Sequence, residues 1–114
     1  MKTITTDELK ALLCEKHEVP TLVNTLEAES FEKTRIPGAI NVPLDSSDFV
    51  TRVEQAAGGK DKPIVVYCAS RQCNSSEKAA QKLDSAGFTA VSRYTDGAAA
   101  WQEEAGEVQA GQCG

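Results

Sequence analysis

The fold is decided by residues 64–86, which read IVVYCASRQCNSSEKAAQKLDSA. The apolar start, Ile64 to Tyr67, predicts a buried parallel strand, because a strand covered on both faces is apolar throughout. After a polar loop, small and apolar residues recur at helical spacing, at Ser76, Ala79, Ala80, Leu83 and Ala86. The stretch therefore predicts a strand, a short loop and a helix, with Cys68 at the carboxyl end of the strand.

Cys68 lies where a thiolate would be stabilised. The first N–H groups of a helix have no partner within the helix, and the helix dipole is positive at that end. Asn74 as N-cap and Glu77 three residues later form a variant of the capping box, so the helix should begin directly after the loop. These groups should lower the pKa of the Cys68 thiol and make the sulfur nucleophilic. A buried structural thiol is the alternative interpretation, since free cysteines are among the most buried residues.

Composition narrows the class of protein. The chain has 114 residues, of which 40% are hydrophobic and 25% charged, as is ordinary for one globular domain. A net charge of −5 argues against nucleic-acid binding, and no apolar run reaches the length of a membrane span. The chain has one histidine, and its four cysteines lack the paired C-x-x-C spacing of zinc sites. We therefore expect no metal, no cofactor and a reducing, cytoplasmic location.

The rest of the chain alternates between strand and helix patterns. Further strands are expected at residues 2–4, 21–24, 39–42 and 88–94, and further helices at 5–16, 27–33, from Ser46 or Ser47 to Ala57, and from 96 onward. This alternation predicts an α/β fold with a parallel sheet covered on both faces and right-handed crossovers. In such sheets ligands bind beyond the carboxyl ends of the strands. The turns after residues 24, 67 and 94 should meet at that edge.

The sequence also predicts which residues cap the expected helices and which ones face the core. Thr5 and Glu8 have the spacing of a capping box at the first helix. Ala28 and Phe31 should point inward from the second helix, and Ser46 or Ser47 should cap the third. Tyr94 and Trp101 are best explained as core residues.

Four motifs, in order along the chain, resemble those of a single-domain rhodanese. They are RIPGAINVP at 35–43, Tyr67-Cys68, AAQKLDSAGF at 79–88 and YTDGAAAW at 94–101. The resemblance implies a rhodanese-like α/β fold with a five-stranded parallel sheet flanked by helices on both faces. We expect residues 1–103 to form this domain and residues 104–114 to be a loosely ordered tail.

The resemblance also implies sulfur transfer. A rhodanese cysteine takes sulfane sulfur from a small anionic donor such as thiosulfate, becomes a persulfide, and passes the sulfur to cyanide, a thiol or a protein acceptor. Cys68 occupies the matching position. The substrate-binding groups would be the backbone amides of Ala69, Ser70, Arg71, Gln72, Cys73 and Asn74. No nucleic-acid or membrane partner is expected.

Some positions depart from the family pattern. Asn24 and Leu26 stand where an Asp and an Arg are usual, and Cys73 stands where the loop usually has Arg. The result is a variant C-x4-C loop, in which Arg71 should help to attract an anionic donor. Cys73 is either a loop filler or a resolving thiol, and the second role would make the protein a thiol–disulfide redox enzyme or redox sensor. A cysteine phosphatase is disfavoured, because Asn74 stands where that chemistry needs Arg.

Overall fold

The apolar stretch before Cys68 forms the central strand of the sheet. Strand β4 spans Ile64–Tyr67, and all four of its residues are buried. It pairs with β2 (Thr21–Asn24) on one side and β5 (Val91–Tyr94) on the other, and β3 (Ile40–Asn41) and β1 (Lys2–Ile4) form the two edges. All four pairings are parallel, in the order β1-β5-β4-β2-β3. The predicted five-stranded parallel sheet is confirmed.

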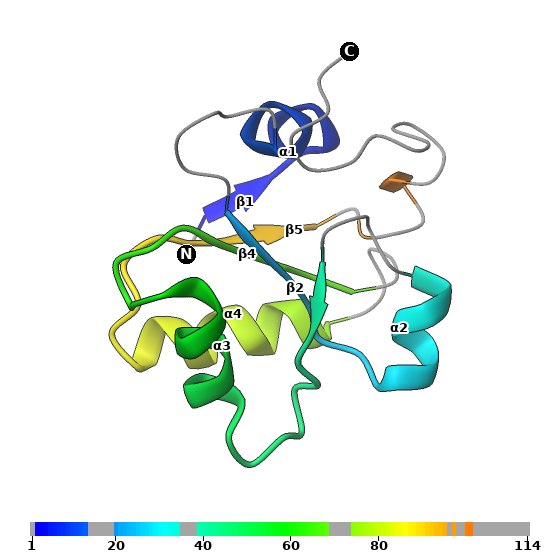
Figure 1. Cartoon of the computed structure of the whole chain (residues 1–114). Coiled ribbons are helices and arrows are strands. Elements are labelled where there is room, and N and C mark those ends of the chain that lie inside the picture. Colours follow the sequence, from blue (N-terminus) through cyan, green and yellow to red (C-terminus); the bar gives the residue numbers. More distant parts are fainter. Residues whose placement is uncertain are drawn as a thin grey trace.

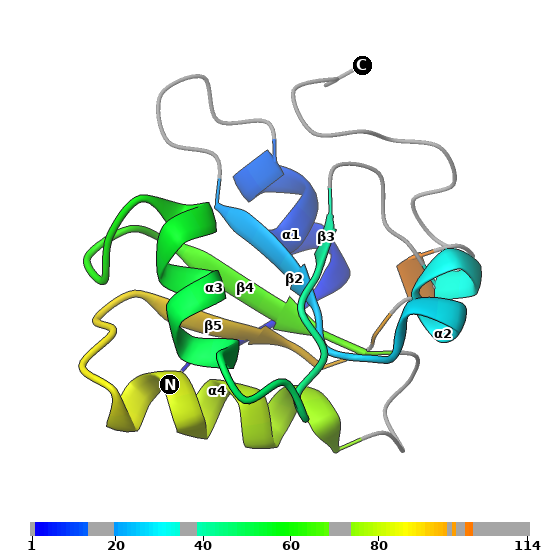
Figure 2. The ribbon, with the colours of Figure 1, turned by 60° about the horizontal axis from the view of Figure 1, so that its bottom comes forward.

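This computed structural model describes residues 2–13, 20–34, 39–68, 74–95, 97 and 100–101. Its four helices are α1 (Thr6–Leu13), α2 (Ala28–Thr34), α3 (Phe49–Ala57) and α4 (Ser75–Ser85). Helix α1 covers one face of the sheet, and α3 and α4 cover the other (Figures 1 and 2). Helix α2 lies beyond the carboxyl ends of β2 and β4 (Figure 1). Gly97, Ala100 and Trp101 are also helical.

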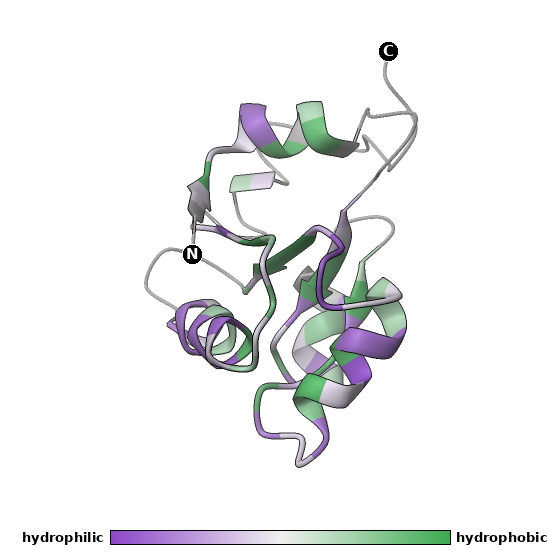
Figure 3. Cartoon of the chain, turned by 90° about the vertical axis from the view of Figure 1, so that its left-hand side faces the viewer, coloured by the Kyte–Doolittle hydropathy of each residue, from purple (hydrophilic) through white to green (hydrophobic). Residues whose placement is uncertain are grey.

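The alternation of side chains along the strands produces one hydrophobic core on each face. Val65 and Tyr67 of β4 pack on the α1 side, in a cluster that includes Leu9 and Trp101. Ile64 and Val66 pack on the other side, with the buried residues of α3 and α4. In Figure 3 the strands at the centre are green, and purple residues lie along the outer sides of the helices. The next residue in this alternation, Cys68, therefore belongs to the α3 and α4 face.

Several expected residue roles are confirmed. Thr5 and Glu8 form the reciprocal capping box of α1, with both N–H groups accepted by the other side chain at 3.2 Å. The end of α3 is also well defined, since Gly58 has the left-handed conformation, with φ of 91°, and donates its N–H to the Glu54 carbonyl. Tyr94 and Trp101 are buried and meet edge to face at 6.4 Å, as expected for core residues.

The expected caps of the other two long helices are wrong in detail. Asn74 is the N-cap of α4, but its side chain makes no capping hydrogen bond. Its ψ of 10° keeps it close to helical geometry, whereas a capping side chain needs a more extended residue. Helix α3 has Asp48 as its N-cap, not Ser46 or Ser47, because a turn in which Phe49 N–H bonds to the Ser46 carbonyl comes first.

Three predictions about element faces and lengths are also wrong. Ala28 is exposed, because α2 lies beyond the sheet and has no sheet face beneath it (Figure 1). The last strand begins at Val91, not at Phe88, since Phe88 N–H still bonds back to the Leu83 carbonyl and closes the end of α4. The third strand is shorter than expected, and only Ile40–Asn41 pair.

Candidate functional site

Cys68 lies directly after β4 and its side chain contacts the first turn of α4. The residue is 1% exposed. The Cys68 thiol donates a hydrogen bond to Ser76 Oγ, with a distance of 3.6 Å between sulfur and oxygen. Ser76 is the second residue of α4 and is equally buried. The strand end and the helix start are thus brought together at the sulfur, as the sequence predicts.

Arg93 joins this contact from the neighbouring strand. Its Nε donates to Ser76 Oγ at 3.0 Å, so the hydroxyl is shared between the arginine and the cysteine. In the register of the sheet Arg93 lies beside Val66, two residues before Cys68. Because side chains repeat every two residues along a strand, Arg93 and Cys68 lie on the same face. Neither Ser76 nor Arg93 was expected as a site residue from the sequence. The signal available was a cation in the middle of a strand, where a polar partner is required.

The turn after β2 is fixed beside the carboxyl end of β4. Thr25 donates both its N–H and its hydroxyl to the Tyr67 carbonyl, at 3.2 and 3.3 Å. The buried Asn24 accepts the Leu26 N–H on its side-chain oxygen at 2.9 Å, which closes an Asx turn. Asn41 Nδ2 donates to the Leu26 carbonyl at 2.7 Å and ties the turn to β3. The turn after residue 24 therefore meets the end of β4, and Asn24 has a structural role in that turn. Residues 69–73 of the turn that follows β4 lie outside the described residues, so the meeting of the two turns stays a prediction.

Several predicted site residues lie outside the described residues. They are Ala69, Ser70, Arg71, Gln72 and Cys73 of the loop. Cys14, Arg35–Gly38, Asp96 and residues 104–114 also lie outside them. Asn74 is described and is exposed at the start of α4. The anion-binding role of the loop amides and the pairing of Cys68 with Cys73 therefore stay predictions.

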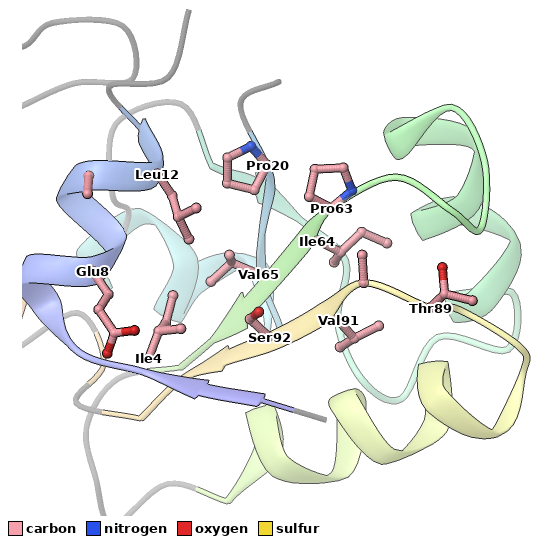
Figure 4. Close-up of a pocket in the computed structure, with 12 residues that line it drawn as sticks. Ile4, Glu8, Leu12, Pro20, Pro63, Ile64, Val65, Thr89, Val91 and Ser92 are labelled. Atoms are coloured by element: carbon pink, nitrogen blue, oxygen red, sulfur yellow. The ribbon is translucent and has the colours of Figure 1, made fainter. Parts of the chain in front are cut away.

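A cavity of about 630 Å³ lies elsewhere, between α1 and the sheet (Figure 4). It is mainly apolar, with Glu8 and Ser92 among its polar groups. The lining residues are Ile4, Glu8, Ala11, Leu12, Pro20, Pro63, Ile64, Val65, Thr89, Ala90, Val91 and Ser92. Most of them come from the amino-terminal halves of β4 and β5 or from α1, whereas Cys68 follows the carboxyl end of β4. This cavity is therefore separate from the candidate site.

Neither a metal-ligand cluster nor a membrane-spanning helix occurs among the described residues. No group of three or more His, Cys, Asp or Glu side chains in this part of the chain could hold a metal ion. None of the described helices is both long and apolar enough to cross a membrane.

Comparison with known proteins gives the family. The sequence model of the rhodanese-like domain family matches residues 5–104, nearly the whole chain. The chain therefore belongs to the rhodanese-like domain family, as its parallel sheet and the position of Cys68 predict.

Two curated relatives contain a similar segment. The chain is 33% identical over 82 residues to the HTH-type transcriptional regulator Rv0324 of Mycobacterium tuberculosis, covering 72% of this chain and 34% of the regulator. It is 31% identical over 87 residues to the adenylyltransferase and sulfurtransferase UBA4 of Meyerozyma guilliermondii, covering 73% of this chain and 20% of that protein. The chain thus spans about a third of the length of the first relative and a fifth of the second.

Solved structures share the fold over most of the chain. The BH2092 protein of Bacillus halodurans superposes with a TM-score of 0.78 and 28% identity, covering 96% of this chain and 77% of that protein. A thiosulfate sulfurtransferase from Pseudomonas aeruginosa gives a TM-score of 0.73 and 25% identity, covering 90% of this chain and 19% of the solved chain. The chain is thus a rhodanese-like domain, homologous to sulfurtransferases.

Proposed function

We propose that the chain is a rhodanese-type sulfurtransferase that carries sulfane sulfur on Cys68. The observation that carries the proposal is the Cys68 thiol directly after the carboxyl end of β4, in contact with the first turn of α4. A helix start favours an anion, and sulfur transfer needs a thiolate nucleophile. The names of two relatives, a thiosulfate sulfurtransferase and an adenylyltransferase and sulfurtransferase, support the same reaction class.

The reaction would proceed in two displacements. The Cys68 thiolate attacks the outer sulfur of a donor such as thiosulfate, a new S–S bond forms, and sulfite leaves with the electron pair of the broken S–S bond. Cys68 then carries an anionic persulfide. In the second step an acceptor nucleophile such as cyanide or a thiolate attacks the outer sulfur. The S–S bond breaks and the Cys68 thiolate is regenerated. The amides of residues 69–74 would bind the anionic groups in both steps.

The intact mass of the protein after incubation with thiosulfate tests this function. We expect a gain of one sulfur atom that maps to Cys68 and is removed by cyanide or by a reducing thiol. A loss of two hydrogens without any sulfur gain would instead indicate the redox role of Cys68 and Cys73. No change in mass with thiosulfate or with persulfide donors would contradict sulfur transfer.

We expect the pKa of the Cys68 thiol to lie below the ordinary value of a free cysteine, about 8.5. The helix dipole and the hydroxyl of Ser76 would stabilise the thiolate, although burial acts in the opposite direction. The rate of Cys68 alkylation against pH, followed by peptide mass, measures this pKa. A midpoint at or above the ordinary value would show that burial outweighs the helix start and Ser76.

A second candidate function rests on the spacing of Cys68 and Cys73 within one loop. The Cys73 thiolate would attack the inner sulfur of the Cys68 persulfide and form a disulfide, and hydrosulfide would leave with the electron pair. An external dithiol would then have to reduce the disulfide in each turnover. In this scheme the C-x4-C loop couples sulfur release to a thiol reductant.

The variant Cys73→Ser tests the second candidate. We expect it to remove any Cys68–Cys73 cross-link, to let the Cys68 persulfide accumulate, and to leave transfer to cyanide largely intact. Peptide mapping after thiosulfate or mild peroxide without reductant makes the measurement, with Cys113→Ser as the matched control. If the wild type forms no cross-link and Cys73→Ser behaves like it, Cys73 is a loop filler.

A further inference from the structure

We propose that Arg93 is a positioning residue for Cys68, acting through the hydroxyl of Ser76. By occupying Ser76 Oγ as a donor, Arg93 leaves the hydroxyl proton of Ser76 free for the sulfur once Cys68 is a thiolate or a persulfide. The part that concerns the persulfide rests on the proposed function, but the part that concerns the thiolate does not.

The donors and acceptors of the two side chains decide how they can bond. A guanidinium group only donates hydrogen bonds, and a serine hydroxyl has one proton and two lone pairs. With Arg93 Nε at 3.0 Å, Ser76 Oγ must accept that bond. When the thiol is neutral, it can donate to the second lone pair, across an Sγ–Oγ distance of 3.6 Å. When the thiol loses its proton, the hydroxyl can turn its own proton toward the sulfur without breaking the Arg93 bond.

Without Arg93 the serine would have a competing choice. A serine hydroxyl can also bond to its own or neighbouring backbone groups. A cation that holds the oxygen from the neighbouring strand favours the orientation toward Cys68. A hydrogen bond to an ion is also stronger than one between neutral groups, so the orientation gains strength when the sulfur is charged.

The surroundings make the arginine an unusual choice for this position. Its neighbours on the same sheet face, Val66 and Val91, belong to the hydrophobic core. A charged group at such a position is costly unless it has a polar partner, and Ser76 is that partner. Arg93 is half-buried, so its stem can pack against the core while its head reaches the start of α4.

The other elements near Cys68 contribute few charged groups among the described residues. The turn after β2 contributes Asn24 and Thr25, which are uncharged. The first turn of α4 contains the acidic residue Glu77. Arg71 of the loop lies outside the described residues. Among the residues that are described, Arg93 is thus the cation whose hydrogen bond leads to the sulfur.

The test measures the pH dependence of Cys68 alkylation by iodoacetamide, with the product mapped by peptide mass. Ser76→Ala should raise the pKa of the Cys68 thiol by about one unit. At pH values below the midpoint, the rate of alkylation should then be about tenfold lower than in the wild type. Arg93→Gln should raise it by about half as much. Arg52→Gln removes the same charge from an exposed arginine of α3 and should leave the midpoint unchanged.

The double variant separates a relay from a simple charge effect. If Arg93 acts through Ser76, Ser76→Ala with Arg93→Gln should lie within about 0.3 unit of Ser76→Ala alone. Additive shifts would overturn the proposal, because Arg93 would then act on the sulfur only through its charge. An unchanged midpoint in Arg93→Gln would also overturn it.

A measurement on the unmutated arginine keeps the proposal testable if Arg93→Gln does not fold. The NMR signal of the Arg93 Nε–H group should change with pH at the midpoint of Cys68 alkylation, and this change should vanish in Cys68→Ser. A signal that does not follow the Cys68 midpoint would overturn the proposal. Neither readout requires sulfur loading. A wild type that forms no persulfide therefore contradicts the proposed function, while the alkylation series still decides the role of Arg93.

Discussion

Replacing Cys68 with serine is expected to abolish sulfur loading completely. Sulfur transfer through a persulfide needs a sulfur nucleophile, and a serine hydroxyl is not ionised at neutral pH. The intact mass of Cys68→Ser after incubation with thiosulfate should show no gain of sulfur, and thiocyanate formation from cyanide should fall to the uncatalysed rate. The fold should survive, because serine is close in size to cysteine and can keep a hydrogen bond to Ser76.

Matched cysteine variants make this result specific. Cys14→Ser and Cys113→Ser each remove one thiol but leave Cys68 in place, and both should load sulfur like the wild type. Circular dichroism and thermal unfolding of Cys68→Ser should confirm a native fold. If a folded Cys68→Ser protein still gains a sulfur atom, another cysteine is the acceptor, and Cys73 becomes the first residue to examine.

The sheet was predictable because its signals are local and strong. The apolar run at Ile64–Tyr67 and the helical spacing of Ala79, Ala80 and Leu83 define β4 and α4 from the sequence alone. Thr5 and Glu8 were equally clear, since both members of that capping box lie within four residues. The position of Cys68 follows from these elements without any knowledge of long-range contacts.

The contacts that complete the site were not predictable in the same way. The hydrogen bond between Arg93 and Ser76 depends on the register of β5 beside β4 and on the rotation of α4, which are set by packing over the whole sheet. The position of Ser76 in the helical stripe correctly predicted burial, but not its shared hydroxyl. The Asx turn of Asn24 depends on three consecutive residues, but the Tyr67 carbonyl that holds Thr25 comes from another strand.

The errors have a common physical cause. Asn74 is the N-cap that its residue type predicts, yet its backbone angles keep the side chain out of the capping geometry. Ala28 has the spacing of an inward residue, but no sheet face lies beneath α2 to receive it (Figure 1). In both cases the local sequence pattern is present, but the surrounding structure decides whether the capping bond forms or the side chain is buried.

Among the variants proposed for this chain, Leu83→Ala is expected to have the largest effect on stability. Leu83 is fully buried on α4, in the same core cluster as Val66, Val91 and Phe88. Truncating a buried leucine costs the lost burial and leaves a cavity, together about 3 kcal/mol of unfolding free energy. For a domain of this size the thermal midpoint should fall by about 10–20 °C.

The control is Gln81→Ala, which changes an exposed residue on the same helix and should alter stability by less than about 0.5 kcal/mol. Urea unfolding of both variants measures the difference in unfolding free energy. The Leu83→Ala change should also affect the site. Helix α4 supplies Ser76 to Cys68, so a helix that packs less firmly should also loosen that contact. Leu83→Ala should therefore shift the Cys68 alkylation midpoint toward that of Ser76→Ala, whereas Gln81→Ala should not. If Leu83→Ala lowers the free energy of unfolding by less than about 1 kcal/mol, the packing of α4 described above is contradicted, because truncating a well-packed leucine destabilises a protein by more than that.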